Sequence, residues 1–235
     1  MNKTLKALSA LLTYPTGELQ GAASEIDLVL AEDRLIPKVV WQQLSKLVTE
    51  LATGDLYDLQ ERYVLLFDRT RSLSLHLFEH VHGESRDRGQ AMIDLKSQYE
   101  QAGLAVTAAE LPDFLPLFLE YLGTRPLSEA CQSLGQPAHI FAALAERLRK
   151  RKSPYEAVFR ALLVLADAKP QQEEVSALLQ APDPDASDLA ALDAAWEDEP
   201  VTFSPGAAGC KDSLIARVRG AMRPAPDMPR PNSRS

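Results

Sequence analysis

The sequence predicts an all-α fold: a single helical-bundle domain over residues 1–180, followed by a disordered, acidic and proline-rich tail over residues 181–235. Three observations support this prediction. Apolar residues recur at helical spacing along nearly all of the first 180 residues. No segment shows the period-two alternation that is typical of a half-buried strand. Hydrophobic residues make up 46% of the 235-residue chain, which is enough for one sizeable core.

Start and stop signals mark the expected helices in the first part of the chain. Thr4 is a candidate N-cap for the first helix. Pro37 can start a helix that Gly54 would end, and Asp55 would cap the next one. The apolar stripes of these helices are Leu5, Leu8, Leu11 and Leu12; Val40, Trp41, Leu44, Leu47, Val48 and Leu51; and Leu56, Leu59, Tyr63, Leu66 and Phe67.

The helical pattern continues to about residue 180 and then stops. Thr107 and Glu110 form a capping-box pattern before LPDFLPLFLEYL, and Ser153 with Pro154 opens a later helix. The stripes are Ala91, Met92, Leu95 and Tyr99; Ile140, Phe141, Leu144 and Leu148; and Tyr155, Val158, Phe159, Leu162, Leu163 and Leu165. The acidic stretch APDPDASDLAALDAAWEDEP and the proline-rich end RPAPDMPRPNSRS have little to bury, which predicts the disordered tail.

Charge and composition narrow the classes of function. The chain has 25 Lys and Arg against 33 Asp and Glu, so its net charge of −8 argues against nucleic acid and favours a basic peptide or protein partner. No apolar run approaches the roughly 18 residues of a membrane span, and no signal peptide is evident, so we expect a cytoplasmic protein without stable membrane insertion. Cys131 and Cys210 form no CxxC pair and are expected as free thiols. No phosphate-cradling glycine loop occurs, and no cofactor is predicted.

The stretch HLFEHVHGE, residues 76–84, is the most unusual local motif. Its first five residues match the H-x-x-E-H pattern of inverted zinc proteases, in which His76 and His80 would bind zinc and Glu79 would activate water. The pattern fixes only three positions, and no second motif marks a third ligand. Two other interpretations are metal binding by His76, His80 and His82 without catalysis, and histidines satisfied by local hydrogen bonds at a helix end. We therefore predict no metal site and keep a zinc hydrolase as an alternative.

The residues that follow this motif favour a binding surface. Between Glu79 and Arg88, seven of the ten positions are ionisable, and Gly83 and Gly89 add backbone freedom. A helix face that is merely solvated does not need this composition. A surface with buried hydrogen bonds and ion pairs would account for it better.

Residues 77–92, LFEHVHGESRDRGQAM, closely resemble the nitrate reductase molybdenum cofactor assembly chaperones of the NarJ type, which belong to the TorD-like redox-enzyme maturation chaperones. The stretches ERYVLLFDRTRSLSL, QYEQAGL, LPDFLPLFLEYL and WEDEPVTF resemble the same family, so the resemblance covers residues 1–205 in outline. The family pattern contains the His80 and His82 pair and does not depend on a histidine at position 76. This favours coincidence as the explanation of the zinc-protease pattern.

The resemblance implies an all-helical, cytoplasmic chaperone that is not an enzyme. Its partner would be the apo catalytic (alpha) subunit of a membrane-bound respiratory nitrate reductase. The chaperone would hold this subunit open until the molybdenum cofactor is inserted, delay its docking at the membrane and assist iron–sulfur maturation. The resemblance also allows an interaction with molybdenum cofactor biosynthesis proteins. A related chaperone for another molybdoenzyme and a generic helical adaptor are the remaining alternatives.

The resemblance also implies that the chaperone binds the N-terminal peptide of its client, a basic segment that can form an amphipathic helix. Such a helix needs an apolar trough with acidic residues on its rim. Trough candidates, whose spacing is equally typical of core packing, are Tyr63, Phe67, Phe78, Phe114, Leu115, Phe118 and Tyr121. Rim candidates that could meet a client Lys or Arg are Glu79, Glu84, Asp87, Asp113 and Glu120.

Two details refine this expected peptide site. Pro112 and Asp113 match a Pro-Asp-His motif of the wider family, whereas Phe114 stands at the histidine position and can neither hydrogen-bond through its side chain nor titrate. His80 and His82 are included in the site because histidine has an ordinary pKa of about 6.5. Their protonation beside the groove would weaken the binding of a cationic peptide.

Overall fold

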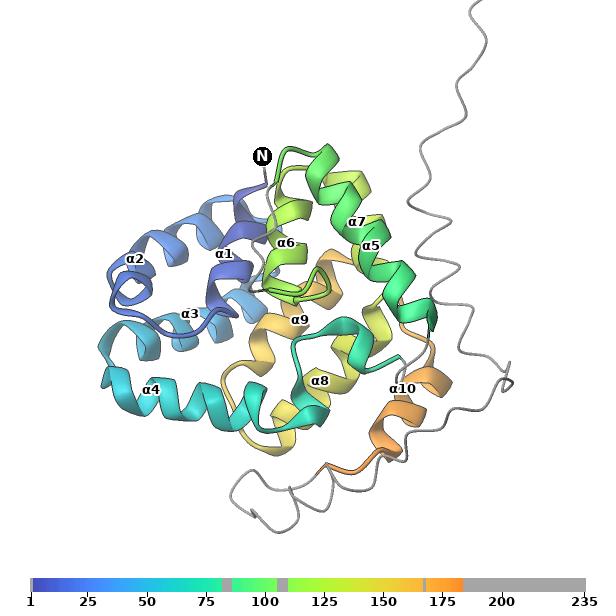
Figure 1. Ribbon diagram of the computed structural model, residues 1–235. Coiled ribbons are helices and arrows are strands. Elements are labelled where there is room, and N and C mark those ends of the chain that lie inside the picture. Colours follow the sequence, from blue (N-terminus) through green and yellow to red (C-terminus); the bar gives the residue numbers. More distant parts are fainter. Residues whose placement is uncertain (1, 82–85, 105–109, 167, 184–235) are drawn as a thin grey trace, which may run out of the picture.

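The computed structural model describes residues 2–81, 86–104, 110–166 and 168–183, and these residues are mainly helical (Figure 1). The α-helices are α1 (Lys3–Leu11), α2 (Gly17–Glu32), α3 (Lys38–Thr53), α4 (Leu56–Tyr63), α5 (Arg86–Gln101), α6 (Leu115–Gly123), α7 (Leu127–Gly135), α8 (Ala138–Lys150), α9 (Glu156–Leu165) and α10 (Gln172–Gln180). A π-helical turn spans Val64–Asp68, and two 3-10 turns span Arg71–Leu73 and Leu77–Glu79. No strand occurs within the described ranges, which confirms the predicted all-α fold.

Several helix boundaries lie where the start and stop signals predict them. Pro37 is the N-cap residue of α3, and Gly54 is its C-cap residue. The Asp55 side chain accepts the backbone N–H groups of Tyr57 and Asp58, and so caps α4. These signals act locally, which is why the sequence alone locates them.

The predicted N-cap of the first helix was wrong. Asn2 caps α1, with its side chain accepting the Leu5 N–H at 3.3 Å. Thr4 lies inside the helix, fully buried, and its N–H and hydroxyl donate to the Asp33 carboxylate at 3.0 and 2.7 Å. Thr4 therefore joins the start of α1 to the end of α2 instead of capping its own helix.

One connected hydrophobic core joins the helices. In Figure 1, α1 to α4 gather on one side and α5, α7 and α10 on the other, with α6, α8 and α9 between them. The pairs α1–α6, α2–α3, α3–α9 and α8–α9 pack against each other. Phe141 of α8 and Phe159 of α9 are fully buried at the centre, with ring centroids 6.4 Å apart. The core cluster extends from Leu5 to Ala166 and so links both halves of the described chain.

The start of α6 corrects a second prediction. The helix begins at Leu115, not after the Thr107–Glu110 pattern, and Thr107 lies outside the described residues. Residues 111–114 form a turn, in which the Phe114 N–H donates to the Leu111 carbonyl at 3.0 Å. The chain there pairs with another segment, described below, and this tertiary pairing overrides the local signal.

The C-terminal helix of the described chain is held by a buried arginine. Arg147 of α8 is 3% exposed and donates to the carbonyl oxygens of Ser72 at 2.6 Å and Leu178 at 2.7 Å. Helices continue to Gln180, and the tail from residue 184 lies outside the described residues, so the domain boundary at residue 180 stays a prediction. Among the described helices, none is long and apolar enough to cross a membrane.

Candidate functional site

Residues 74–81, here called the histidine segment, pair with the turn that precedes α6. His76 and Phe114 form an antiparallel β-bridge. Around it, the Leu77 N–H donates to the Asp113 carbonyl at 3.1 Å, and the Leu115 N–H donates to the Leu75 carbonyl at 2.9 Å. Leu75 and Leu77 are buried on either side of His76, which is half-buried. Because Leu75 and Leu77 point into the core, the His76 side chain between them points toward the surface.

Asp113 is the buried anchor of this pairing. It is fully buried, and its Oδ2 accepts the Phe78 N–H at 3.1 Å while its Oδ1 lies 3.2 Å from His76 Nδ1. The neighbouring Pro112 carbonyl accepts the Tyr99 hydroxyl at 2.8 Å, which ties the turn to α5. Asp113 is therefore buried and not exposed on a rim, because these donors enclose the carboxylate, and its contact with a client cation stays a prediction.

His76 and Phe114 form a half-exposed aromatic pair at the surface. Their ring centroids are 5.3 Å apart, with the planes inclined by 34°. The hydrogen bond to Asp113 raises the pKa of His76, and the Glu79 charge acts in the same direction, whereas partial burial and Arg88 oppose it. Phe114 cannot titrate, as expected, but it supplies an apolar face beside a histidine that is more easily protonated.

His80 has a different environment, although it lies only four positions after His76. Its Nε2 lies 2.7 Å from the Ser74 carbonyl oxygen, so the ring forms a hydrogen bond within the histidine segment, to the first residue of that segment. Burial lowers the pKa of His80. Glu79 lies between the two histidines, is half-buried and is 3.9 Å from Arg88. His80 is therefore a structural side chain in this geometry.

The zinc-hydrolase alternative finds no support in this arrangement. His76 and His80 do not share a helix face, because a 3-10 turn separates them and each imidazole bonds to a different partner, Asp113 or Ser74. Among the residues that the structure describes, no group of three or more His, Cys, Asp and Glu could hold a metal ion. His82, part of the expected pair, lies outside the described residues.

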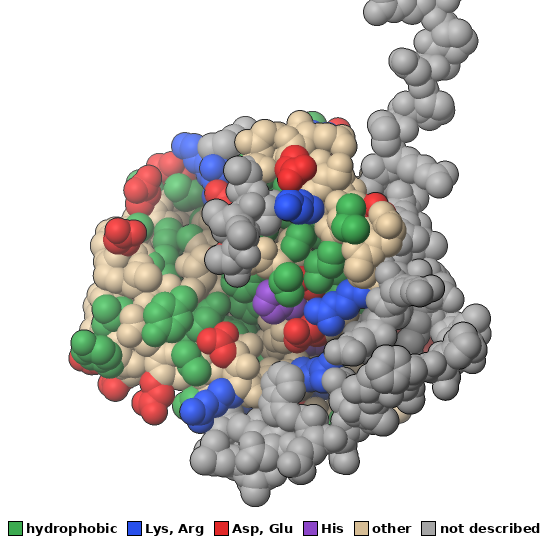
Figure 2. All heavy atoms as spheres, in the orientation of Figure 1, with side chains coloured by type: hydrophobic (Ala, Val, Ile, Leu, Met, Phe, Trp, Pro, Cys, Tyr) green, Lys and Arg blue, Asp and Glu red, His purple; other side chains and the backbone are tan. Residues whose placement is uncertain are grey.

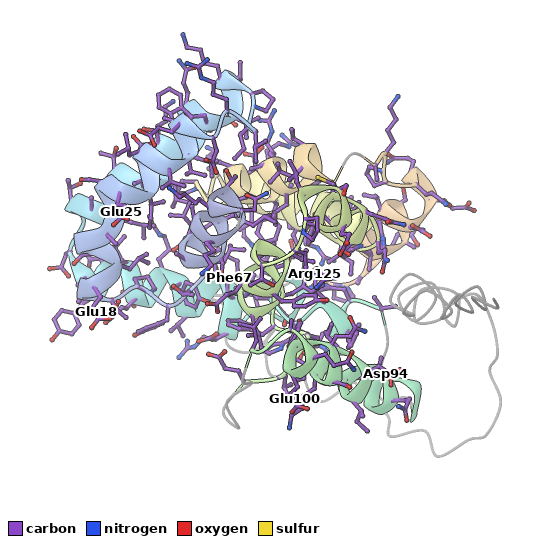
Figure 3. All side chains as sticks on the ribbon, turned by 90° about the horizontal axis from the view of Figure 1, so that it is seen from above. Glu18, Glu25, Phe67, Asp94, Glu100 and Arg125 are labelled. Atoms are coloured by element: carbon purple, nitrogen blue, oxygen red, sulfur yellow. The ribbon has the colours of Figure 1, made fainter. Side chains whose placement is uncertain are left out.

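Most aromatic candidates for the trough are core residues. Tyr63, Phe67, Phe78 and Phe118 are between 3% and 5% exposed, and Leu115 is fully buried. The Tyr63 ring lies 5.0 Å from Phe67, and Figure 3 shows Phe67 within the bundle. They do not line an open trough here, because the bundle uses them to pack its own helices, and client binding by them stays a prediction. Phe114 and Tyr121 differ, since both are only half-buried.

The acidic candidates are scattered rather than grouped on one rim. Glu120 is exposed on α6, and Glu79 is half-buried beside His76. Glu84 lies outside the described residues, and Asp87 lies in α5 without a described side chain. Client binding by any of these residues stays a prediction.

Two exposed acids near the aromatic pair were missed. The charge of His76 lowers the pKa of Asp68, although burial raises it overall, so the two groups interact electrostatically. Glu110 is exposed at the other end of the same turn as Phe114, beside the 47% exposed Leu111. No local pattern in the sequence distinguishes them: Asp68 lies eight residues before His76, and Glu110 lies four residues before Phe114.

The result is a surface, here called the His76 surface, that combines a half-exposed aromatic pair with acidic side chains. Its members are His76, Phe114, Leu111, Asp68, Glu79 and Glu110. Figure 2 shows a histidine on one face of the molecule among hydrophobic, acidic and basic side chains. An apolar contact beside negative charge can accept a peptide that carries both apolar and basic side chains.

Comparison with known proteins adds evidence over up to 94% of the chain. A family model described as nitrate reductase delta subunit matches residues 34–161. The chain is 44% identical over 224 residues to the nitrate reductase molybdenum cofactor assembly chaperone NarJ of Escherichia coli strain K12, covering 94% of each chain. It is 42% identical to the probable chaperone NarW of the same strain, covering 90% of this chain and 88% of NarW.

A more distant relative supports the same grouping. The chain is 30% identical over 178 residues to the probable nitrate reductase molybdenum cofactor assembly chaperone NarJ of Bacillus subtilis strain 168, covering 76% of this chain and 96% of that relative. These matches extend far beyond residues 77–92 and confirm the resemblance that this stretch first indicated. The chain belongs to the family of nitrate reductase molybdenum cofactor assembly chaperones.

Proposed function

We propose that this protein binds the apo catalytic subunit of a membrane-bound nitrate reductase and keeps it competent for insertion of the molybdenum cofactor. Part of this binding would be to the basic N-terminal peptide of the subunit, and it would delay docking at the membrane. The single observation that carries the proposal is the 44% identity to E. coli NarJ over 94% of both chains. The proposal places the protein in the cytoplasm, where cofactor insertion precedes membrane docking, and gives it no enzymatic activity.

The His76 surface is the best candidate for the peptide contact. Phe114 and Leu111 offer apolar area, and Asp68 and Glu110 are exposed carboxylates near them. Basic peptides gain association rate and orientation from such charges, while the apolar contact supplies most of the affinity. This replaces the expected trough, in which Tyr63, Phe67, Phe78 and Phe118 are committed to the core.

Two alternatives are weaker. The relatives reported above are all named for nitrate reductase, so a chaperone for another molybdoenzyme has no observation in its favour. A generic adaptor would be distinguished by the molybdenum content of nitrate reductase in cells without this protein. The proposal expects that content to fall, whereas an adaptor would leave it unchanged.

The peptide contact is tested by calorimetric titration of the full-length protein with the N-terminal peptide of the nitrate reductase catalytic subunit from the same organism. We expect saturable one-to-one binding. Phe114→Ala should weaken it about tenfold, which corresponds to about 1.4 kcal/mol. The double variant Asp68→Asn, Glu110→Gln should weaken it about threefold, and this effect should shrink as salt is added.

The matched control is the double variant Glu18→Gln, Glu25→Gln. Both glutamates are exposed on α2, and Figure 3 shows them along its outer side, away from α5. This control variant removes the same net charge as Asp68→Asn, Glu110→Gln and should leave the affinity for the peptide unchanged. Binding that is equally weakened by both double variants would reflect overall charge and would refute the His76 surface. Binding to the apo-subunit but not to the peptide would move the site elsewhere on the client.

A further inference from the structure

The outer face of α4 and of the π-helical turn that continues it carries apolar and acidic side chains in alternation. Its members, here called the α4 strip, are Tyr57, Glu61, Val64, Leu65 and Asp68. These positions follow the spacing i, i+4, i+7, i+8 and i+11, so they share one side of the helix. The opposite side is buried in the core and consists of Leu59, Tyr63, Leu66 and Phe67.

The apolar members of the strip lie outside the core. Tyr57 is 81% exposed. Val64 and Leu65 are half-buried, but they belong neither to the core cluster nor to the described side chains packed against it. The Tyr14 ring adds to this apolar surface, because it is 45% exposed and its centroid lies 5.6 Å from that of the buried Tyr63. In Figure 2, hydrophobic side chains extend from the histidine toward the side of the molecule where Figure 1 places α4, with acidic side chains among them.

The exposed charges along this element are mostly negative. From residue 55 to residue 69, the exposed charged residues are Asp55, Asp58, Glu61, Asp68 and Arg69. Arg62 is half-buried and bonds to Glu50 of α3. Glu61 and Asp68 are seven residues apart, so about 10 Å of helix axis, or two turns, separates them. A partner that carries positive charge at the same interval is complementary to the strip.

The π-helical turn connects the strip with the His76 surface. The Arg69 N–H donates to the Val64 carbonyl, five positions back, at 2.9 Å. Asp68 ends this turn and interacts electrostatically with His76, so the two surfaces share one residue. Turns of this kind are rare and are found frequently at functional sites. The strip is therefore a continuation of the His76 surface along α4.

The carboxylates of the strip limit what can cover it. The chain's own residues 185–199 include six Asp and Glu and no Lys or Arg, so the strip would repel this segment. A second copy of the chain, related by a two-fold axis, would set the same carboxylates against each other. A basic partner is the complementary occupant, and the helix face that it must match is about 16 Å long.

We propose that the α4 strip extends the peptide contact of the His76 surface and takes a basic amphipathic helix of about three turns. The apolar members of the strip pack against the apolar side of this helix, and Glu61 and Asp68 each meet a Lys or Arg. The two cations lie about seven residues apart in the partner, which is two helical turns. This inference rests on the proposed function, because the occupant is the N-terminal peptide of the client.

The experiment is a calorimetric titration of full-length variants with the N-terminal peptide of the nitrate reductase catalytic subunit from the same organism. Tyr57→Ser should weaken binding about tenfold, because an aromatic contact is removed. Glu61→Lys should weaken it about fivefold at low salt and less at high salt. Both side chains are exposed, so neither variant should change the melting temperature.

The matched controls lie on α2. Leu28→Ser removes an apolar side chain that is 56% exposed, and Glu25→Lys reverses an exposed charge. Neither control should change the affinity for the peptide. Equal losses in the α2 and α4 variants would reflect overall charge or surface hydrophobicity and would overturn the proposal.

Charge reversal on both partners locates the two cations. Each Lys or Arg of the peptide is replaced by Glu in turn, and these peptides are titrated into Glu61→Lys and into Asp68→Lys. One peptide should restore the binding of each variant, and the two restoring positions should be about seven residues apart. Restoration at positions on opposite sides of the helix, or at no position, would refute the predicted spacing and the strip.

Failure of the strip can be distinguished from failure of the client function. If the peptide binds and Phe114→Ala weakens the binding, while the α4 variants do not, the strip is refuted and the proposed peptide contact stands. If the peptide does not bind to the unmodified protein, the peptide contact itself is refuted, and the strip with it.

Discussion

At the scale of single residues, two histidines four positions apart respond to protons in opposite ways. The hydrogen bond to buried Asp113 raises the pKa of His76, whereas burial lowers the pKa of His80 against the opposing effect of its hydrogen bond to the Ser74 carbonyl. Asp68, Glu79 and Arg88 also act on His76. Neither effect follows from the H-x-x-E-H pattern, because Asp113 lies 37 residues away in the chain.

The pH dependence of folding should carry the signature of His76. Because its pKa is raised on folding, its stabilising contribution is fully present below about pH 6.5 and is lost as pH rises through the folded pKa. His76→Gln should therefore lower the free energy of unfolding more at about pH 5.5 than at about pH 8.5. Urea unfolding of both proteins at the two pH values measures this difference.

His80→Gln serves as the control of opposite sign. The pKa of His80 is lowered on folding, so its contribution is present above about pH 6.5 and is lost as pH falls through the folded pKa. The destabilisation caused by His80→Gln should accordingly be smaller at the acid end. Two variants with the same pH trend would contradict the opposite environments described for the two rings.

The same residues show how far a sequence can predict this site. The sequence and the family resemblance selected Asp113 and Phe114, and the structure places both at the centre of the pairing with the histidine segment. Their roles were less predictable: Asp113 is an internal anchor, and Phe114 is the partner of His76. Burial is decided by contacts between distant segments, and helical spacing cannot separate a core stripe from a surface groove.

At the scale of elements, helix type was predicted well and helix ends less so. Local caps such as Asp55 acted as predicted, whereas Thr4 and the Thr107–Glu110 pattern did not. In both failures a tertiary hydrogen bond changes the local outcome, through Asp33 in the first case and through the bridge to His76 in the second. The role of Arg147 also could not be predicted, because its acceptors come from two other elements.

Arg147 should control the docking of α10. Its planar guanidinium reaches the Ser72 and Leu178 carbonyls together, which a lysine ammonium cannot reproduce. Arg147→Lys should leave one buried carbonyl unsatisfied and cost about 1–3 kcal/mol. Hydrogen exchange measured by mass spectrometry should show faster exchange of the amides in α10, with smaller changes in α2 and α3.

Arg149→Lys is the matched control, since Arg149 lies two residues further along the same helix. Its guanidinium bonds to Glu146 on the surface, and a lysine can keep that ion pair. Exchange in α10 should stay at the level of the unmodified protein. Equal exchange of α10 in both variants would mean that the helix is held by its apolar contacts, including the buried Val175, and not by Arg147.

At the scale of the whole molecule, the connected core argues for a single folding unit. Buried residues from α1 to α9 belong to one cluster, and α9 packs against both α3 and α7. The sequence predicted this core from the apolar stripes of most helices, but it assigned no stripe to α2, α7 or α10. It could not predict which helices meet, because any two amphipathic helices of similar length can bury their stripes against each other.

One core should give one cooperative unfolding transition, even though the described helical region is longer than most two-state domains. Trp41 lies in α3, and Trp196 is the only other tryptophan in the chain. In the variant Trp196→Phe, tryptophan fluorescence therefore reports on the surroundings of Trp41 in α3. Circular dichroism at about 220 nm reports on all helices together. The two signals should share one urea midpoint. A fluorescence transition that precedes the loss of helix would show that α2 and α3 unfold before α6, α8 and α9, and the predicted single domain over residues 1–180 would then have to be divided.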